Sequence, residues 1–452
     1  MKQDGSTRHI HGLSGLLIVT FFALITAIPG LALAAAPPNV LLIISDDQSW
    51  TDFGFMGHKT IQTPHIDRLA RQSAVFPNGY VPSSLCRPSL ATLVTGLYPH
   101  QHGITGNDPP RGTNRIRMLK HIQAHPTLPR WLATLGYRSL QTGKWWEGHP
   151  RLGGFTDAMT HGDPKRGGRH GDLGLKIGRT GLDPIYDFIS DCGKKPFFIW
   201  YAPFLPHTPH NPPRRLLDRY RTPDRPIELA RYYAMCTWFD ETCGELLEHL
   251  DKHNLADNTL VLFVVDNGWI QRTPATRVPD GWRYRFAPRS KRSPNEGGVR
   301  TPIMVRWPGH VKPGTRTDLA SSIDLAPTIL AATGITPKAK LPGLDLVALA
   351  SRKPDAPVTR SSVYGEIFAH DVVDINRPST SLQYRWIRSG SLKLIAPAGS
   401  AKPQLFDLKA DPHETTDLAD KAPDRVSRLK SLLDTWWRPR PFPAKPSEPS
   451  GP

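Results

Sequence analysis

Three short, largely apolar runs constrain the fold of this chain more than any other feature. They are Asn39 to Ser45 (NVLLIIS), Pro196 to Tyr201 (PFFIWY) and Thr259 to Val265 (TLVLFVV). A strand without a polar side is buried on both faces, which is typical of parallel sheets covered by helices. Helical patterns lie between these runs, at Ser89 to Thr95 and Ala230 to His253. The alternation predicts an α/β fold with a large doubly wound, mostly parallel sheet flanked by helices.

The end of the chain has a different pattern. Tyr384 to Ile395 predicts a hairpin, Gln404 to Leu408 a further strand, and Asp424 to Trp437 an amphipathic helix. These elements predict a small C-terminal α+β subdomain, an antiparallel sheet plus a helix. The last fifteen residues hold six prolines and predict a tail. We therefore expect four segments: a signal peptide at 1–34, the main α/β domain at 35–360, the α+β subdomain at 361–437 and a proline-rich tail at 438–452.

The first 34 residues have the three parts of a secretory signal peptide. Lys2 and Arg8 give a positive start, Leu16 to Ile28 is apolar, and Ala32-Leu33-Ala34 is a small-x-small cleavage site. A single membrane anchor is the alternative, but a bilayer span needs about 20 apolar residues. We expect export to a periplasm or the cell exterior, with no stable membrane anchor.

Composition narrows the class of protein. With 38% hydrophobic and 21% charged residues among 452, the chain is neither disordered, nor a coiled coil, nor a polytopic membrane protein. Four cysteines are too few for a disulfide-built scaffold. The net charge of +17 favours an anionic partner. For an exported chain that partner is more naturally a polyanionic glycan or a cell surface, so no nucleic acid is expected.

Two of the strand runs end in acidic and amide side chains. The first leads into Asp46 and Asp47, the other into Asp266 and Asn267. Ligands of open α/β sheets sit beyond the carboxyl ends of strands, and three carboxylates placed there repel unless a cation neutralises them. An all-oxygen set favours Ca²⁺ or Mg²⁺ over zinc. The alternative is that these residues only form turns and caps.

A single cysteine stands at a predicted helix start. Cys86-Arg87-Pro88-Ser89 precedes an apolar helical run that closes at Gly96. Pro88 suits the first helical turn, which puts Cys86 at the end where backbone N–H groups favour an anion. Considered without its neighbours, this cysteine is equally well explained as a small hydrophobic residue buried in the core.

The ordered motifs resemble the type I sulfatases, the formylglycine-dependent, arylsulfatase-like members of the alkaline phosphatase superfamily. Gln404 to Ala419 also resembles the end of that family, so the likeness covers roughly residues 38 to 437. The segments that carry it, in order, are Asp46-Asp47, Cys86 to Ser89 leading to Thr95-Gly96, Gly143-Lys144-Trp145, Asp266-Asn267-Gly268 and Glu296-Gly297-Gly298.

The resemblance implies roles for particular residues. Cys86 would be oxidised by the formylglycine-generating enzyme to Cα-formylglycine (3-oxoalanine), whose hydrate is the nucleophile. Lys144 and Lys291 match the lysines that hold the sulfate, and His207 the histidine that assists leaving-group departure, with His210 as a rival. Without the motifs, Lys144 and Lys291 would be interpreted as solvated surface lysines, and His207 as a loop histidine. The implied Ca²⁺ ligands are Asp46, Asp47, Asp266 and Asn267.

Two positions depart from the family pattern. Leu90 stands where the maturation signature C-x-P-S-R has Arg, and Trp146 stands where a His follows Lys-Trp. Arg87, or Glu147 and His149, could substitute in space. Both departures concern the formylglycine and neither touches the metal site.

We therefore expect an exported, Ca²⁺-dependent sulfuric ester hydrolase that acts on O-sulfate esters, with a sulfated glycan as the favoured substrate. One alternative is a phosphodiesterase or phosphonate hydrolase on the same scaffold, and another is a non-catalytic protein that binds sulfated glycan. Residues 267–300 predict a long surface excursion, in which neighbouring sulfates or carboxylates could be bound by Arg272, Arg277, Arg283, Arg285 and Arg289.

Overall fold

The computed structural model describes residues 36–162, 172–353 and 359–439, so the predicted signal peptide and all but the first two residues of the predicted tail lie outside the described residues. Within these residues the larger sheet has nine strands in the order β4-β3-β5-β1-β6-β7-β2-β8, and β9 also pairs with β2. The first five strands in this order are mutually parallel, and β7 is antiparallel to β6 and β2. The predicted mostly parallel sheet is confirmed. The strands are β1 Asn39–Ser45, β2 Ala74–Tyr80, β3 Arg138–Gly143, β4 Asp157–Ala158, β5 Phe197–Ala202, β6 Thr259–Val265, β7 Arg300–Arg306, β8 Gly314–Thr315 and β9 Ala320–Ser321.

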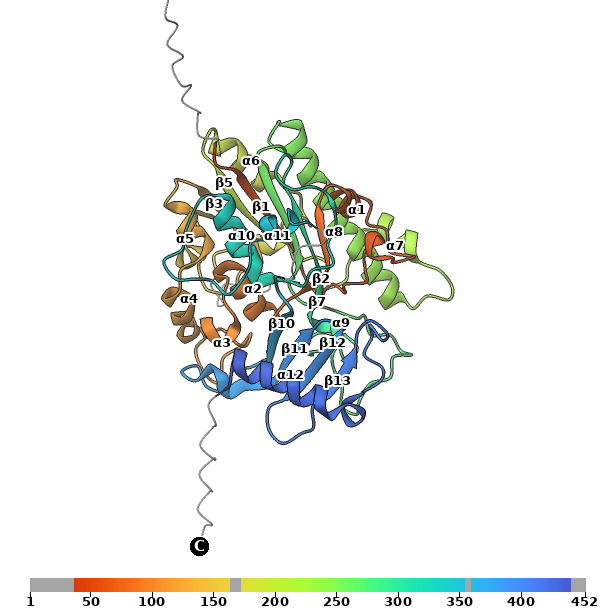
Figure 1. Cartoon of the computed structure of the whole chain (residues 1–452). Coiled ribbons are helices and arrows are strands. Elements are labelled where there is room, and N and C mark those ends of the chain that lie inside the picture. The colour runs from red at the N-terminus through yellow and green to blue at the C-terminus, as the bar shows by residue number, and fades with distance from the viewer. Residues whose placement is uncertain (1–35, 163–171, 354–358, 440–452) are drawn as a thin grey trace, which may run out of the picture. The chain divides into compact units, whose positions relative to one another are not determined.

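Helices cover both faces of this sheet (Figure 1). The helices that precede the second sheet in the chain are α1 Pro64–Arg71, α2 Cys86–Thr95, α3 Pro99–His102, α4 Lys120–Ala124, α5 Leu128–Ala133, α6 Asp183–Cys192, α7 Arg214–Tyr220, α8 Ile227–Lys252, α9 Glu296–Val299, α10 Leu325–Ala332 and α11 Leu346–Ala350. In the described part of the chain, none of the helices is both long and apolar enough to cross a membrane.

The side chains of β1 show why the strand is apolar throughout. Val40, Leu42 and Ile44 pack into one core with α2, α5 and α10, while Leu41 and Ile43 pack into another with α1, α6 and α8. Successive side chains of a strand point to opposite faces, so a strand covered on both sides has no place for a polar side chain. This packing holds the carboxyl end of β1 in a fixed position.

The C-terminal elements form a second, antiparallel sheet in the order β10-β11-β12-β13. Leu429 and Leu433 of the final helix pack against Ile387 and Leu394 of this sheet. The predicted hairpin, strand and amphipathic helix are all present. Their bounds are β10 Ser362–Phe368, β11 Leu382–Ser389, β12 Leu392–Pro397, β13 Gln404–Asp407 and α12 Pro423–Trp436.

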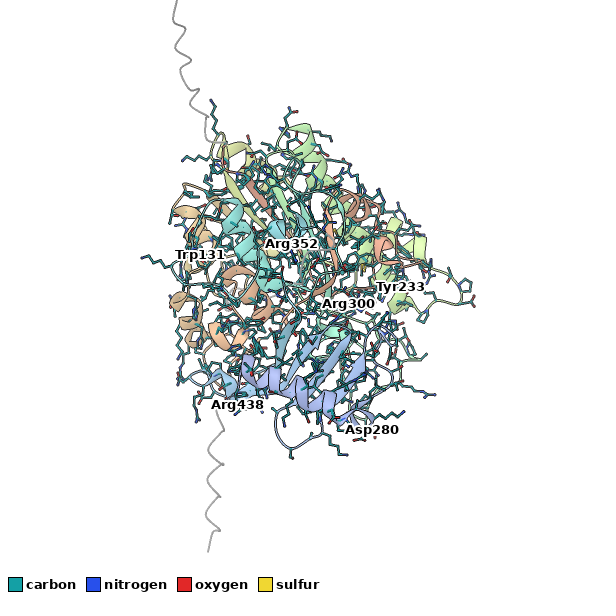
Figure 2. The ribbon with its side chains drawn as sticks, viewed as in Figure 1. Trp131, Tyr233, Asp280, Arg300, Arg352 and Arg438 are labelled. Carbon is teal, nitrogen blue, oxygen red and sulfur yellow. The ribbon has the colours of Figure 1, made fainter. Side chains whose placement is uncertain are left out.

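A buried ionic cluster joins the two sheets. The ammonium group of Lys393 on β12 lies 2.8 Å from Oε1 of Glu296 and 3.0 Å from Oε1 of Glu414. The Glu296 backbone N–H donates to Glu414 Oε2 at 2.8 Å, and the hydroxyl of Tyr80 donates to Glu296 Oε2 at 2.9 Å. Arg300, labelled in Figure 2, adds a longer ion pair of 3.7 Å to Glu296. The cluster therefore attaches the second sheet to α9, at the start of β7.

Candidate active site

The carboxyl ends of β1 and β6 lie side by side. The two strands are parallel and in register from Asn39 and Thr259 to Ser45 and Val265, so the acidic residues that follow them meet. The Asp47 backbone N–H donates to Asp266 Oδ1 at 3.1 Å, and Asn267 Nδ2 donates to Asp47 Oδ1 at 2.6 Å. Asp47 has φ of 60°, a left-handed conformation that Asp tolerates better than most residues. The turn thus directs both predicted pairs into one buried cluster.

Three oxygens of this cluster have no hydrogen-bond donor among the described residues. They are Oδ2 of Asp46, Oδ2 of Asp266 and Oδ1 of Asn267, and all three are buried. Burial raises the pKa of Asp46 well above its ordinary value, although Lys144 acts in the opposite direction. A buried acceptor without a partner is costly, and oxygens of this kind are the ligands of hard cations. The donor set therefore fits Ca²⁺ or Mg²⁺.

Cys86 begins α2 and is 1% exposed. Its Sγ lies 3.3 Å from Nζ of Lys144 and 3.2 Å from Nζ of Lys291. Burial raises the pKa of the thiol to about 12, although the two lysines act in the opposite direction. An unmodified Cys86 would be a protonated thiol at neutral pH and a weak nucleophile.

Both lysines also contact the acidic cluster. Lys144 follows β3 directly and its Nζ lies 2.7 Å from Asp46 Oδ1, while Nζ of Lys291 lies 2.5 Å and 2.7 Å from the two oxygens of Asp47. Burial alone would lower the pKa of each lysine, but the facing carboxylates outweigh it and the pKa of both is above its ordinary value. Two permanent cations therefore flank the sulfur of Cys86.

The structure separates the two candidate histidines. His207 Nδ1 lies 2.6 Å from the carbonyl oxygen of Thr208, which can only accept, so Nδ1 carries a proton. Its Nε2 lies 3.3 Å from Asp47 Oδ2. His207 and Cys86 line the same cavity of about 290 Å³, whereas His210 lines a neighbouring cavity. Only His207 is positioned beside the cysteine.

Comparisons with known proteins identify the family of the chain. The sulfatase family model matches residues 38–335, and a model for the C-terminal part of N-sulphoglucosamine sulphohydrolase matches residues 286–435. The chain belongs to the sulfatase family. This sulfatase is 31% identical to human N-acetylgalactosamine-6-sulfatase over 366 residues, which cover 72% of this chain and 68% of that protein. It is 29% identical to human arylsulfatase A over 480 residues, with coverages of 89% and 88%.

A solved structure shows the same fold. The structure of a protein in complex with its substrate D-glucosamine-2-N,6-O-disulfate superimposes with a TM-score of 0.68 at 21% identity, covering 88% of this sulfatase and 97% of that chain. The prediction of a type I sulfatase from the ordered motifs is confirmed, and the protein is a sulfuric ester hydrolase.

The sulfatase departs from its family next to Cys86, and none of the predicted substitutes reaches the sulfur within hydrogen-bond distance. The guanidinium of Arg87 is buried and donates to both oxygens of Glu147, at 2.6 Å and 2.7 Å. The charges of Arg87 and Glu147 therefore balance each other. His149 is exposed, and Leu90 packs in the core of the large sheet. Arg87 is thus buried, and its charge is paired with Glu147.

Other side chains, which the sequence analysis did not identify, complete the cavity around Cys86. Asn107 Oδ1 accepts the backbone N–H of Arg87 at 3.0 Å, and its Nδ2 lies 3.4 Å from Nε2 of His370. Arg292 and His370 line the same cavity, the latter from the loop after β10. None of the motifs identified in the sequence includes Asn107, Arg292 or His370.

The excursion at 267–300 is not wholly on the surface. Trp269 and Phe286 are buried and pack with Tyr232 and Cys236 of α8. The sequence contains no periodic pattern there because the buried residues are anchors of an irregular loop rather than one face of a helix or strand. The anchoring matters, since the loop carries Lys291 into the site.

Proposed function

We propose that this sulfatase is an exported, Ca²⁺-dependent enzyme that removes O-sulfate esters from a sulfated glycan through a formylglycine made from Cys86. The observation that supports this most strongly is the position of Cys86 Sγ, within 3.3 Å of two lysine ammonium groups and beside an acidic cluster with three unpartnered oxygens. Two ammonium groups and a cation site around one side chain are suited to binding a sulfate monoester and to offsetting the charge of its transition state.

In this proposal the lysines and the histidine act on the sulfate ester. Lys144 and Lys291 bind sulfate oxygens and offset the charge that builds up in the transition state. Nε2 of His207 moves a proton to the departing oxygen. Burial lowers the pKa of His207 well below its ordinary value, so at neutral pH its Nε2 is unprotonated in the free enzyme. In this proposal Nε2 takes up a proton from solvent when the anionic ester binds, and then transfers that proton to the departing oxygen.

The absent groups would supply the remaining chemistry. Formylglycine at position 86 would supply an aldehyde hydrate as the nucleophile. Ca²⁺ would supply charge neutralisation and polarisation of an oxygen nearby. The residues proposed to hold the cation are Asp46, Asp47, Asp266 and Asn267.

The experiment has two readouts. The first is mass spectrometry of the tryptic peptide from Gln72 to Arg111, which contains Cys86; formylglycine is expected there in protein from its own cells. The second is free sulfate released from sulfated oligosaccharide. Cys86→Ala should reduce this release by at least about 10³-fold. Cys192→Ala, at another buried free thiol, is the matched control and should not.

The other outcomes point to the alternatives. Intact cysteine, no sulfate release and retained oligosaccharide binding would identify a non-catalytic glycan-binding protein, which Leu90 and Trp146 favour. Faster turnover of bis(4-nitrophenyl) phosphate than of any sulfate ester would identify a phosphodiesterase. Export is tested separately, by N-terminal sequencing of the secreted or periplasmic protein, where a mature chain beginning at Ala35 is expected.

A further inference from the structure

A second cavity adjoins the one that contains Cys86. It has a volume of about 410 Å³. Arg283, Tyr284 and Arg285 line both cavities, so the two adjoin along this segment. A substrate large enough to extend past the Cys86 cavity along these residues would enter the second one.

The second cavity is strongly basic. Four arginines line it, against one carboxylate, that of Glu228. In the described part of the chain, none of the four forms a salt bridge with a carboxylate. By contrast, Arg87, Arg360 and Arg385 are each paired within 2.8 Å. The four are Arg231, Arg272, Arg283 and Arg285.

The wall that carries these charges is held in place. Along Trp282 to Phe286 aromatic residues alternate with arginines, and the rings of Tyr284 and Phe286 stack with centroids 5.0 Å apart. Nη1 of Arg272 donates to the carbonyl oxygens of Trp282 and Tyr284, at 3.0 Å and 3.2 Å. Arg231 is contributed to the lining by α8. The guanidinium of Arg272 and the backbone of this segment are therefore fixed before binding, which lowers the conformational entropy lost when a ligand arrives.

We propose that this cavity is a subsite for a second anionic group, a sulfate or a carboxylate, on a sugar next to the one that loses its sulfate. Arginine presents planar pairs of N–H donors that match both groups. The substrate would then be a polyanionic oligosaccharide rather than a monosulfated one. The inference rests on the proposed sulfatase activity at Cys86 and assigns that site its substrate class. Arg277 and Arg289 are not part of the lining of this cavity.

The test compares two variants on two substrates. Arg231→Gln removes a charge from the second cavity only, and should lower kcat/KM for a disulfated disaccharide by about tenfold, mainly through KM. It should leave kcat/KM for 4-nitrophenyl sulfate, which has one anionic group, as in the wild type. Arg219→Gln on α7 is the matched control: Arg219 is also exposed but lines neither cavity, and neither substrate should be affected.

Each outcome decides the matter. The subsite is refuted if Arg231→Gln changes nothing, if Arg219→Gln lowers the disaccharide rate equally, or if the wild type prefers the monosulfated disaccharide. A disaccharide with one sulfate and one carboxylate distinguishes the two anions. If the wild type releases no sulfate from any substrate, the proposed function fails; calorimetric binding of the disulfated disaccharide, weakened by Arg231→Gln and not by Arg219→Gln, would then still support the subsite.

Discussion

Replacing Lys393 by Met should strongly destabilise the protein, because it removes the cation shared by two buried carboxylates. The Lys393 side chain is 0% exposed and those of Glu296 and Glu414 are each 1% exposed. Met fills a similar volume, so the loss of packing is small. What remains is a pair of buried acids. Among the described residues, Glu296 keeps the hydroxyl of Tyr80 and the more distant charges of Arg300 and Arg388.

Removing one partner of a buried ion pair typically costs about 3–5 kcal/mol. An unfolding entropy of about 2 cal/mol/K per residue gives roughly 0.8 kcal/mol/K for a chain of this size, so Tm should fall by about 4–6 °C. Burial alone would raise the pKa of Glu296, but Lys393, together with Arg300 and Arg388, outweighs it and holds this pKa below its ordinary value. In the wild type this carboxylate therefore stabilises the fold above the unfolded pKa of about 4.3.

The variant reverses the sign of that contribution. Without Lys393 the folded pKa of Glu296 should rise above the unfolded value, and its contribution is then lost as pH increases. The difference in Tm between wild type and Lys393→Met should therefore widen from pH 4.5 to pH 7.5. Differential scanning calorimetry at both pH values, with denaturant unfolding at pH 7.5, measures it.

Two further variants complete the experiment. Lys402→Met removes an exposed lysine that pairs with Asp420 in the same part of the chain, where the side chains are 86% and 89% exposed, and Tm should not change. Adding Glu414→Gln to Lys393→Met removes one of the stranded charges and should recover part of the loss. A difference below about 1 kcal/mol at pH 7.5, or one that does not depend on pH, would refute the reasoning.

Three other predictions follow from the geometry. Ca²⁺ at 100 times its Kd should stabilise chelator-treated protein by about 2.7 kcal/mol, seen as a rise in Tm; an unchanged Tm would contradict the cation site. Gly143→Ala should sharply reduce soluble yield and Tm, because at φ 70° the added Cβ would lie 1.8 Å from the carbonyl oxygen of Ala202. The control is Gly136→Ala, where φ is 79° but no atom lies within 4 Å of the added Cβ, so stability should fall by only about 1–2 kcal/mol. Equal losses of stability in the two variants would contradict this reasoning. Burial raises the pKa of Asp240 to about 7, so its contribution to stability falls as pH rises from 4 to 7, and Asp240→Asn should show a smaller fall in Tm over that range. Parallel pH profiles would argue against it.

Much of the fold could be predicted from short stretches of sequence. The bounds of β1 and β6 were predicted to the residue, because a strand buried on both faces must be apolar at every position and polar residues mark its ends. The same local logic predicted that Cys86 begins a helix that closes at Gly96, whose φ of 69° suits glycine. Ordered motifs were sufficient for the family, since each lies within a few consecutive residues.

The details of the site depended on tertiary packing. Nothing local distinguishes His207 from His210, which lie three residues apart and line different cavities. The sequence left Arg87 as a candidate to replace the missing arginine. In the structure its charge is paired with that of Glu147, a buried residue 60 positions away in the chain. The sequence by itself therefore determined the family, the strands and the residue types gathered at their ends. Only the tertiary structure decided which charges face the cavity, because that depends on contacts between segments far apart in the chain.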